Sequence, residues 1–387
     1  MKRLNQILCG VIAAGLFAMP VTSQAADITS SAVLEHYSSV VYASYSDSIA
    51  AAREMQTVID AFLAAPSEES LAAARKAWLA AREFYLPTEA YRFYSGPIDD
   101  AQGPEARINA WPIDESYIDY VKGKAKAGII NNPKVAITKE KLKSLNEKGG
   151  EENVSTGWHA IEFLLWGQDF NAKGPGDRQF TDFVDGKAPN ADRRRQYMKV
   201  VTSLMIEDLE NVAKQWAPAE QNYRSKFVAG DKESLKKALT GLGVLTRGEL
   251  AGQRMEVAMD TQNQEDEHSC FSDNTHRDVV GDVIGMQNVW EGRYTTKEGK
   301  TLEGASLKAL VAQKNPAVAD LVSADIAQSL KLANEIQAPF DQEIIGKKDA
   351  PGRKRVQAVI DALKKQGKDL VAAAETLGIK RLTTKQP

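Results

Sequence analysis

Residues 30–63 read SSAVLEHYSSVVYASYSDSIAAAREMQTVIDAFL, and this stretch decides the fold class. Its apolar side chains recur three or four positions apart, which is the spacing of one face of an α-helix and not the alternation of a half-buried strand. The face consists of Val33, Tyr37, Val40, Val41, Tyr45, Ile49, Ala52, Met55 and Ile59. Pro66 ends the segment, because proline has no backbone N–H with which to continue a helix. The stretch predicts one long helix with a single buried face.

The same spacing continues along the chain and predicts seven more helices. They are expected at residues 71–93, with a kink at Pro87, and at residues 156–166, 192–216, 234–260, 274–290, 316–336 and 351–377. Residues 292–304, with a turn at Glu298 and Gly299, are expected to form a small β-hairpin. Few other strands are expected.

The eight predicted helices fall into two sets of four with a similar order of features. Each set has a long helix bearing Arg and Glu, then a polar loop, then a capped helix that ends near Trp166 or Trp290. We interpret this order as an all-α fold of two four-helix bundles related by internal duplication, with the polar loops meeting between them. The expected domains are residues 26–230 and residues 231–387.

The first 25 residues have the features of a secretory signal peptide. Lys2 and Arg3 precede a short apolar run at residues 7–19, and small residues follow up to Ala25. The run is shorter than the roughly 20 apolar residues that span a bilayer. We therefore expect cleavage after Ala25 and a periplasmic mature protein.

Net charge and cysteine content limit the partners and the covalent cross-links that the mature protein can have. Loss of residues 1–25 changes the formal charge from −3 to −5, and nothing in this balance indicates a nucleic-acid partner. Cleavage also removes Cys9 and leaves Cys270 as the only cysteine, so no intrachain disulfide can form. The stability of the mature protein must therefore come from burial.

The segment STGWHAIEFLLWG, residues 155–167, carries the most chemical information. It is apolar nearly all round, which predicts a buried helix, and His159 and Glu162 lie three residues apart on one face of it. A buried carboxylate without a partner is very costly, so Glu162 needs a cation. The helix N-terminus disfavours imidazolium and keeps His159 neutral, the form that binds metal. By spacing alone the alternative stays open that Glu162 pairs with a buried arginine such as Arg82 and that His159 is a core residue.

Two further segments combine polar and aromatic residues. GPEARINAWPID, residues 103–114, belongs to a stretch at 95–132 that is long for a connection, and long ordered loops are usually functional. HSCFSDNTHRD, residues 268–278, holds two of the four histidines of the chain. Either these histidines bind a ligand, or Asp273 or Asn274 caps a helix and they lie on the surface.

Gly157, His159 and Glu162 match the Gly-x-His-x-x-Glu signature of imelysin-like proteins. Residues 103–114 and 268–278 also look like segments of the iron-regulated protein A branch of that family. The resemblance covers much of the mature chain. It implies two helical bundles with a site near their junction, a periplasmic or outer-membrane-associated location, and a role in iron uptake. The implied partners are iron or an iron complex and an iron-transport component of the outer membrane or periplasm.

On this resemblance His159 and Glu162 are expected to bind metal, and Glu105 and Asp114 in the long loop are expected to supply further ligands. Imidazole and oxygen ligands suit iron, which is expected ahead of haem or zinc. The other residues expected to bind are Arg82, Glu89, Arg107, Trp111, His268, Asn274 and His276. Glu89 lies with Arg82 and Arg92 on one helix face, so a salt-bridge network is its alternative role.

Three functions compete at this point. The first is a binding protein for iron, a ferric chelate or haem. The second is a metallopeptidase, because the founding imelysin was classed as one, but such an enzyme would need His268 or His276 as a third ligand and lacks the usual His-Glu-x-x-His helix. The third is a binder of an anionic polymer such as alginate, which the acidic mature chain disfavours. We expect a binding protein and no enzymatic activity.

Overall fold

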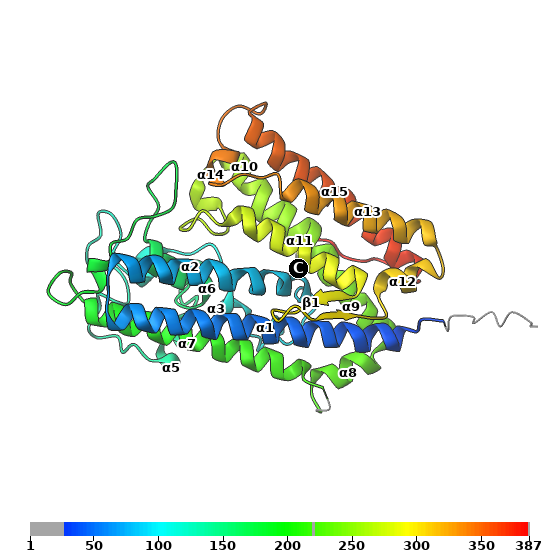
Figure 1. Ribbon diagram of the computed structural model, residues 1–387, viewed down its shortest axis with the longest axis horizontal. Coiled ribbons are helices and arrows are strands. Elements are labelled where there is room, and N and C mark those ends of the chain that lie inside the picture. Colours follow the sequence, from blue (N-terminus) through cyan, green and yellow to red (C-terminus); the bar gives the residue numbers. More distant parts are fainter. Residues whose placement is uncertain (1–26, 219–220, 386–387) are drawn as a thin grey trace, which may run out of the picture.

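The long helix predicted from residues 30–63 is one of four helices of the N-terminal half that pack side by side. The computed structural model describes residues 27–218 and 221–385, and the predicted signal peptide lies outside them. The group consists of α1 (Ser30–Ala64), α2 (Glu68–Tyr85), α6 (Gly157–Trp166) and α7 (Ala191–Trp216). The helix α1 packs against both α2 and α7, and α6 packs between these two, as Figure 1 shows in blue to green.

The second group of helices lies beside the first and belongs to the yellow-green to red part of Figure 1. Its members are a continuous run of α9 (Asp231–Gly243), η3 (Val244–Glu256) and α10 (Val257–Thr261), followed by α11 (Thr275–Glu291), α13 (Pro316–Ala333) and α15 (Pro351–Thr376). The helix α15 packs on α13 and η3, and α13 packs on α11. The predicted all-α class is therefore confirmed.

Short elements connect the long helices. They are η1 (Leu86–Tyr91), α3 (Glu105–Ile108), α4 (Glu115–Ile118), α5 (Lys139–Leu145), η2 (Phe180–Phe183), α8 (Tyr223–Ala229), η4 (Gln264–Asp266), α12 (Leu307–Ala312) and α14 (Asp341–Ile344). Strands β1 (Arg293–Thr295) and β2 (Thr301–Glu303) pair antiparallel, with Tyr294 opposite Leu302, and so form the expected hairpin. The long polar stretch at residues 95–132 is thus ordered and contains α3 and α4.

Two helices differ from the predictions. The helix predicted at residues 71–93 ends at Tyr85 and is not kinked, because Pro87 cannot donate the next helical hydrogen bond and the chain tightens into the 3₁₀ turn η1. The helix predicted at 234–260 contains a π-helix, η3, in its middle. In the wider π turn residues five apart lie on the same face, and Arg254 Nε accordingly donates to Glu249 Oε1 at 2.9 Å.

The two groups touch where η1 meets α11. A Cβ atom at Gly285 would lie 2.4 Å from the carbonyl oxygen of Pro87, so only glycine permits this approach. The buried apolar residues form one continuous core that runs through both groups. The predicted division at residues 230 and 231 stays a prediction. Within the described residues, no helix has the length and apolar character needed to cross a membrane.

Candidate functional site

The helix α6 carries the Gly-x-His-x-x-Glu segment and is buried along its whole length. Its first residue, Gly157, has a φ of +90°, and a Cβ atom there would lie 2.5 Å from the carbonyl oxygen of Ile108 at the end of α3. Glycine is therefore required by both the backbone conformation and the contact. Thr156 occupies the N-cap position, but its hydroxyl donates to the carbonyl of Arg107 at 3.0 Å and does not cap the helix. The start of α6 is thus held against the loop at residues 103–114.

His159 and Glu162 form a buried pair on α6. The His159 Nδ1 and Glu162 Oε2 atoms are 2.8 Å apart, and the backbone N–H and hydroxyl of Ser272 donate to Glu162 Oε1 at 3.0 and 2.6 Å. Burial raises the pKa of Glu162 to about 8 and lowers the pKa of His159 well below its usual value. Among the described residues the direct partners of Glu162 are thus neutral, and the alternative in which Glu162 pairs with Arg82 is wrong.

His268 repeats this arrangement from the other group of helices. Its Nδ1 atom is 2.7 Å from Asp278 Oδ2, and the Ser269 hydroxyl donates to the same oxygen at 2.5 Å. Burial lowers the pKa of His268 well below its usual value. The His159 and His268 rings meet edge to face with their centroids 4.7 Å apart. Two neutral imidazoles, each with Nδ1 against a carboxylate, therefore lie in contact at the junction of the two groups.

Arg82 lies beside these histidines in an aromatic box. Its guanidinium group is 5.3–5.6 Å from the ring centroids of Trp78, Tyr85 and Trp158. It donates to Asn109 Oδ1 at 2.5 Å and forms an ion pair with Asp278 at 3.5 Å. Cation–π contacts and a buried carboxylate together compensate its desolvation. Asp278 thus joins Arg82 to His268.

Glu89 belongs to a second buried network. It accepts from Arg92 and Arg254, each at 2.5 Å, and from the Tyr85 hydroxyl at 2.8 Å. Burial alone would raise the pKa of Glu89, but Arg92 and Arg254 outweigh it and hold the pKa below its usual value. The salt-bridge alternative for Glu89 is the arrangement observed, with Arg254 as a partner that sequence analysis missed.

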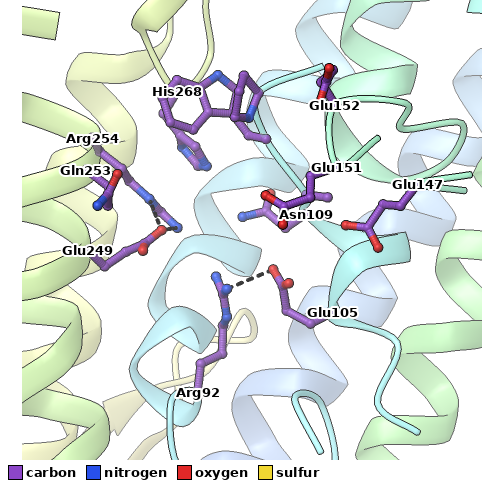
Figure 2. Close-up of a pocket in the computed structure, with 13 residues that line it drawn as sticks. Arg92, Glu105, Asn109, Glu147, Glu151, Glu152, Glu249, Gln253, Arg254 and His268 are labelled. Atoms are coloured by element: carbon purple, nitrogen blue, oxygen red, sulfur yellow. Dashed lines mark hydrogen bonds and ion pairs between the residues drawn. The ribbon is translucent and has the colours of Figure 1, made fainter. Parts of the chain in front are cut away.

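A cavity of about 510 Å³ opens beside these networks, and His268 forms part of its wall. Figure 2 shows two ion pairs in its lining, Arg92 with Glu105 and Arg254 with Glu249. The segment that contains Glu147, Glu151 and Glu152 lies on the opposite side from Arg254. The other lining residues are Asn109, Ala110, Trp111, Pro112 and Gln253. The loop at residues 103–114 thus supplies one wall of the cavity. This wall lies next to His159 and His268, which are called the histidine pair below.

A sequence model of the imelysin family matches residues 41–370, which is most of the chain and includes both groups of helices. The chain belongs to the imelysin family.

Individual relatives agree with this assignment. Iron-regulated protein A of Synechococcus elongatus is 24% identical over 358 residues, which cover 89% of this chain and 87% of that protein. A crystal structure of a protein described as an iron-regulated protein A precursor, from Parabacteroides distasonis, has a TM-score of 0.70 and 19% identity over 91% of this chain and 97% of its own. An imelysin-like protein from Psychrobacter arcticum has a TM-score of 0.64 and 16% identity, with coverage of 92% and 98%. At these identities the two solved structures establish the shared imelysin fold alone.

The structure brings together some of the residues expected to act in this imelysin. His159, Glu162, Arg82 and His268 are joined by direct contacts, and the Trp111 ring lies edge-on to His268 with centroids 5.7 Å apart. Among the described residues, however, no three or more His, Cys, Asp or Glu side chains are arranged to hold one metal ion. The expected four-ligand set is thus not preformed.

The other expected site residues have different surroundings. Glu105 lines the cavity but pairs with Arg92 at 2.8 Å, and Asp114 caps α4 by accepting from the Ser116 N–H at 2.9 Å. Arg107 binds both carboxylate oxygens of Asp208 on α7.

The two remaining candidates lie at the start of α11. His276 Nδ1 is 3.2 Å from the Asp273 carbonyl. Asn274 occupies the N-cap position of α11 without a side-chain capping bond. The cluster at residues 268–278 is therefore divided, because His268 joins the histidine pair and His276 does not.

Proposed function

We propose that this imelysin-family protein binds iron at the histidine pair, with His159 and His268 as the protein ligands. The observation that carries the proposal is the paired geometry: both Nδ1 atoms lie against carboxylates, and His159 Nε2 is buried without a hydrogen-bond partner. Metal-binding histidines almost always use one ring nitrogen for the metal and donate from the other to a carboxylate or carbonyl. The donor set therefore fits a metal that accepts imidazole.

The carboxylates have a supporting role in this proposal. Both oxygens of Glu162 are occupied, by His159 and by Ser272, so Glu162 orients His159 and does not bind the metal directly. Asp278 does the same for His268. Two protein ligands leave the remaining coordination positions to water or to groups that arrive with the metal. Such an open site suits capture and release better than permanent storage.

Iron is the proposed metal because of the relatives. Imidazole binds zinc, copper and nickel as well as iron, so the ligands alone do not choose among them. The similarity to iron-regulated protein A of Synechococcus elongatus, over most of both chains, favours iron. A zinc peptidase would need three protein ligands, and the described residues offer no such group.

The test is a titration of metal-free protein with iron, followed by metal analysis after dialysis. We expect about one iron per chain in the wild type and at least a tenfold loss of affinity in His159→Ala and in His268→Ala. His276→Ala is the matched control, because this histidine bonds only to a nearby backbone carbonyl and should leave affinity unchanged. Retained iron in both His159→Ala and His268→Ala would refute the proposal.

A further inference from the structure

Three glutamates on one segment line the cavity next to the histidine pair. Glu147, Glu151 and Glu152 lie between α5 and α6, on the side of the cavity away from Arg254 (Figure 2). All three side chains are exposed, and none forms an ion pair with any residue in the described part of the chain. Glu147 is partly shielded from solvent, and this shielding, together with weaker repulsion from Glu151, raises the pKa of Glu147. These acids are called the rim glutamates below.

The two guanidinium groups that line the cavity are already paired. Arg92 binds Glu105 at 2.8 Å and Glu89 at 2.5 Å. Arg254 binds Glu89 at 2.5 Å and both Glu249 and Asp282 at 2.9 Å. An anionic ligand would therefore have to displace carboxylates that are in place, whereas receptors for carboxylates and phosphates present arginines ready for bidentate contact. Among the described residues, the cavity lining offers no such arginine.

The charges of the lining have one predominant sign. Glu105, Glu147, Glu151, Glu152 and Glu249 oppose Arg92 and Arg254, and the formal excess is three negative charges with His268 neutral. A cleft lined by one sign of charge raises the local concentration of ions of the opposite sign and their rate of association. The cavity volume of about 510 Å³ does not distinguish a small molecule from a hydrated ion as the ligand. It lies within the usual range for small-molecule sites and also admits a hydrated ion. Charge is therefore the property that selects the ligand.

We propose that iron enters this cavity as a hydrated cation, attracted by the rim glutamates toward His268, and not as an anionic ferric chelate or as haem. The inference rests on the proposed function, since it assumes that His159 and His268 bind iron. It goes beyond that function by naming the form in which the metal arrives. The rim glutamates act on the approach of the ion and are not ligands in its final site.

The test compares the wild type with the variant Glu147→Gln/Glu151→Gln/Glu152→Gln. The probes are Fe²⁺ under anaerobic conditions, ferric citrate and haemin, and binding is followed by stopped-flow quenching of tryptophan fluorescence, to which Trp111 beside His268 should contribute. At low ionic strength the triple variant should bind Fe²⁺ about tenfold more slowly than the wild type. At about 0.5 M salt the two rates should converge, because exposed charges are then screened. Ferric citrate and haemin should bind the wild type more weakly than Fe²⁺ does, and ferric citrate should bind the triple variant better than the wild type.

The matched control is Glu298→Gln/Asp320→Asn/Glu375→Gln, which removes the same charge from exposed positions that do not line the cavity. It should bind Fe²⁺ at the wild-type rate. Equal Fe²⁺ rates in the wild type and the rim variant at low salt would overturn the inference, as would an equal loss in the control or tighter binding of ferric citrate or haemin by the wild type. If iron binds and requires His159 and His268 while any of these results is obtained, the inference fails and the proposed function stands. The rim variant should fold, because its side chains are exposed, and circular dichroism verifies this.

Discussion

His159 and His268 each face a carboxylate, but the surroundings of the two carboxylates differ. Glu162 is held by a hydroxyl and a backbone N–H of Ser272, whereas Asp278 lies next to the buried guanidinium of Arg82. If Glu162 is neutralised, no buried cation loses its partner. If Asp278 is neutralised, Arg82 loses its carboxylate. The two positions therefore allow paired tests of similar side-chain changes.

The change Glu162→Gln should keep or raise the stability of the metal-free protein. The pKa of Glu162 is raised to about 8 in the folded state, so folding retains a proton that the unfolded chain releases above its ordinary pKa near 4.5. This group therefore makes the folded state less stable as pH rises from about 4.5 to 8, by on the order of 2–5 kcal/mol. Glutamine has no such titration. Melting curves at pH 5 and pH 8 should show a smaller loss of stability with pH in the variant than in the wild type.

The same variant should bind iron about 10–100-fold more weakly, the usual effect of losing a carboxylate that orients a metal-binding histidine. Titration of both proteins with Fe²⁺ measures this. A variant that is much less stable than the wild type at pH 8 without metal, with unchanged iron affinity, would make Glu162 a structural residue.

The change Asp278→Asn should be destabilising as well as harmful to iron binding. It leaves the buried Arg82 without its charged partner, a loss that typically costs about 3–5 kcal/mol. It also weakens the hold on His268 Nδ1. Chemical denaturation at pH 7 should separate this variant clearly from Glu162→Gln. Equal stability of the two variants would mean that Asn109 and the aromatic box suffice to hold Arg82.

Among the elements, the contact between η1 and α11 joins the two groups of helices. Gly285→Ala should destabilise the protein by about 1–3 kcal/mol, because the added methyl group would lie 2.4 Å from the Pro87 carbonyl and force the elements apart. Gln287→Ala on the same helix is the control and should change stability by less than about 0.5 kcal/mol. Differential scanning calorimetry compares the three proteins. A wild-type melting temperature in Gly285→Ala would show that the contact is not tight.

The elements also mark the limit of sequence-based prediction. Spacing alone located α1, α6, α7, α11, α13 and α15 to within a few residues, because each has an apolar face that the core requires. It did not reveal η3, since over so short a segment the slightly longer turn of a π-helix cannot be told from an α-helix by apolar spacing, and so the pairing of Glu249 with Arg254 was missed. It also extended α2 past Pro87. Local hydrogen bonding, which the apolar pattern does not encode, decided these cases.

The sequence predicted contacts of site residues that are close together in the chain, and did not predict contacts between residues that are far apart in it. The pairing of His159 with Glu162 followed from three-residue spacing on one helix. The contact between His159 and His268 depends on how α6 and the loop before α11 pack, and no spacing rule gives it. Ser272 and Asp278 were visible as polar residues near His268, but their partners were not. Asp114 and Arg107 were expected at the site because they belong to the long loop whose residues 103–114 resemble the family, yet they bind elsewhere.

For the whole molecule, export stays a prediction that the N-terminal residues motivate. Lys2, Arg3 and the apolar run at residues 7–19 predict removal of residues 1–25. Protein isolated from the periplasm of a Gram-negative host should therefore begin near Ala26 on N-terminal sequencing. Recovery of the chain in the cytoplasm with Met1 intact would contradict the prediction and place the proposed iron site in a reducing compartment.

The π-helix η3 has a consequence for comparing sequences within the family. A single-residue deletion between Glu249 and Arg254 that returned this turn to ordinary α geometry would leave the two residues four apart, which is again one face of the helix. The glutamate and the arginine would then still face each other. Alignments that place a one-residue gap between Glu249 and Arg254 should therefore keep both residues, at a spacing of four in place of five, as a register marker readable without any structure.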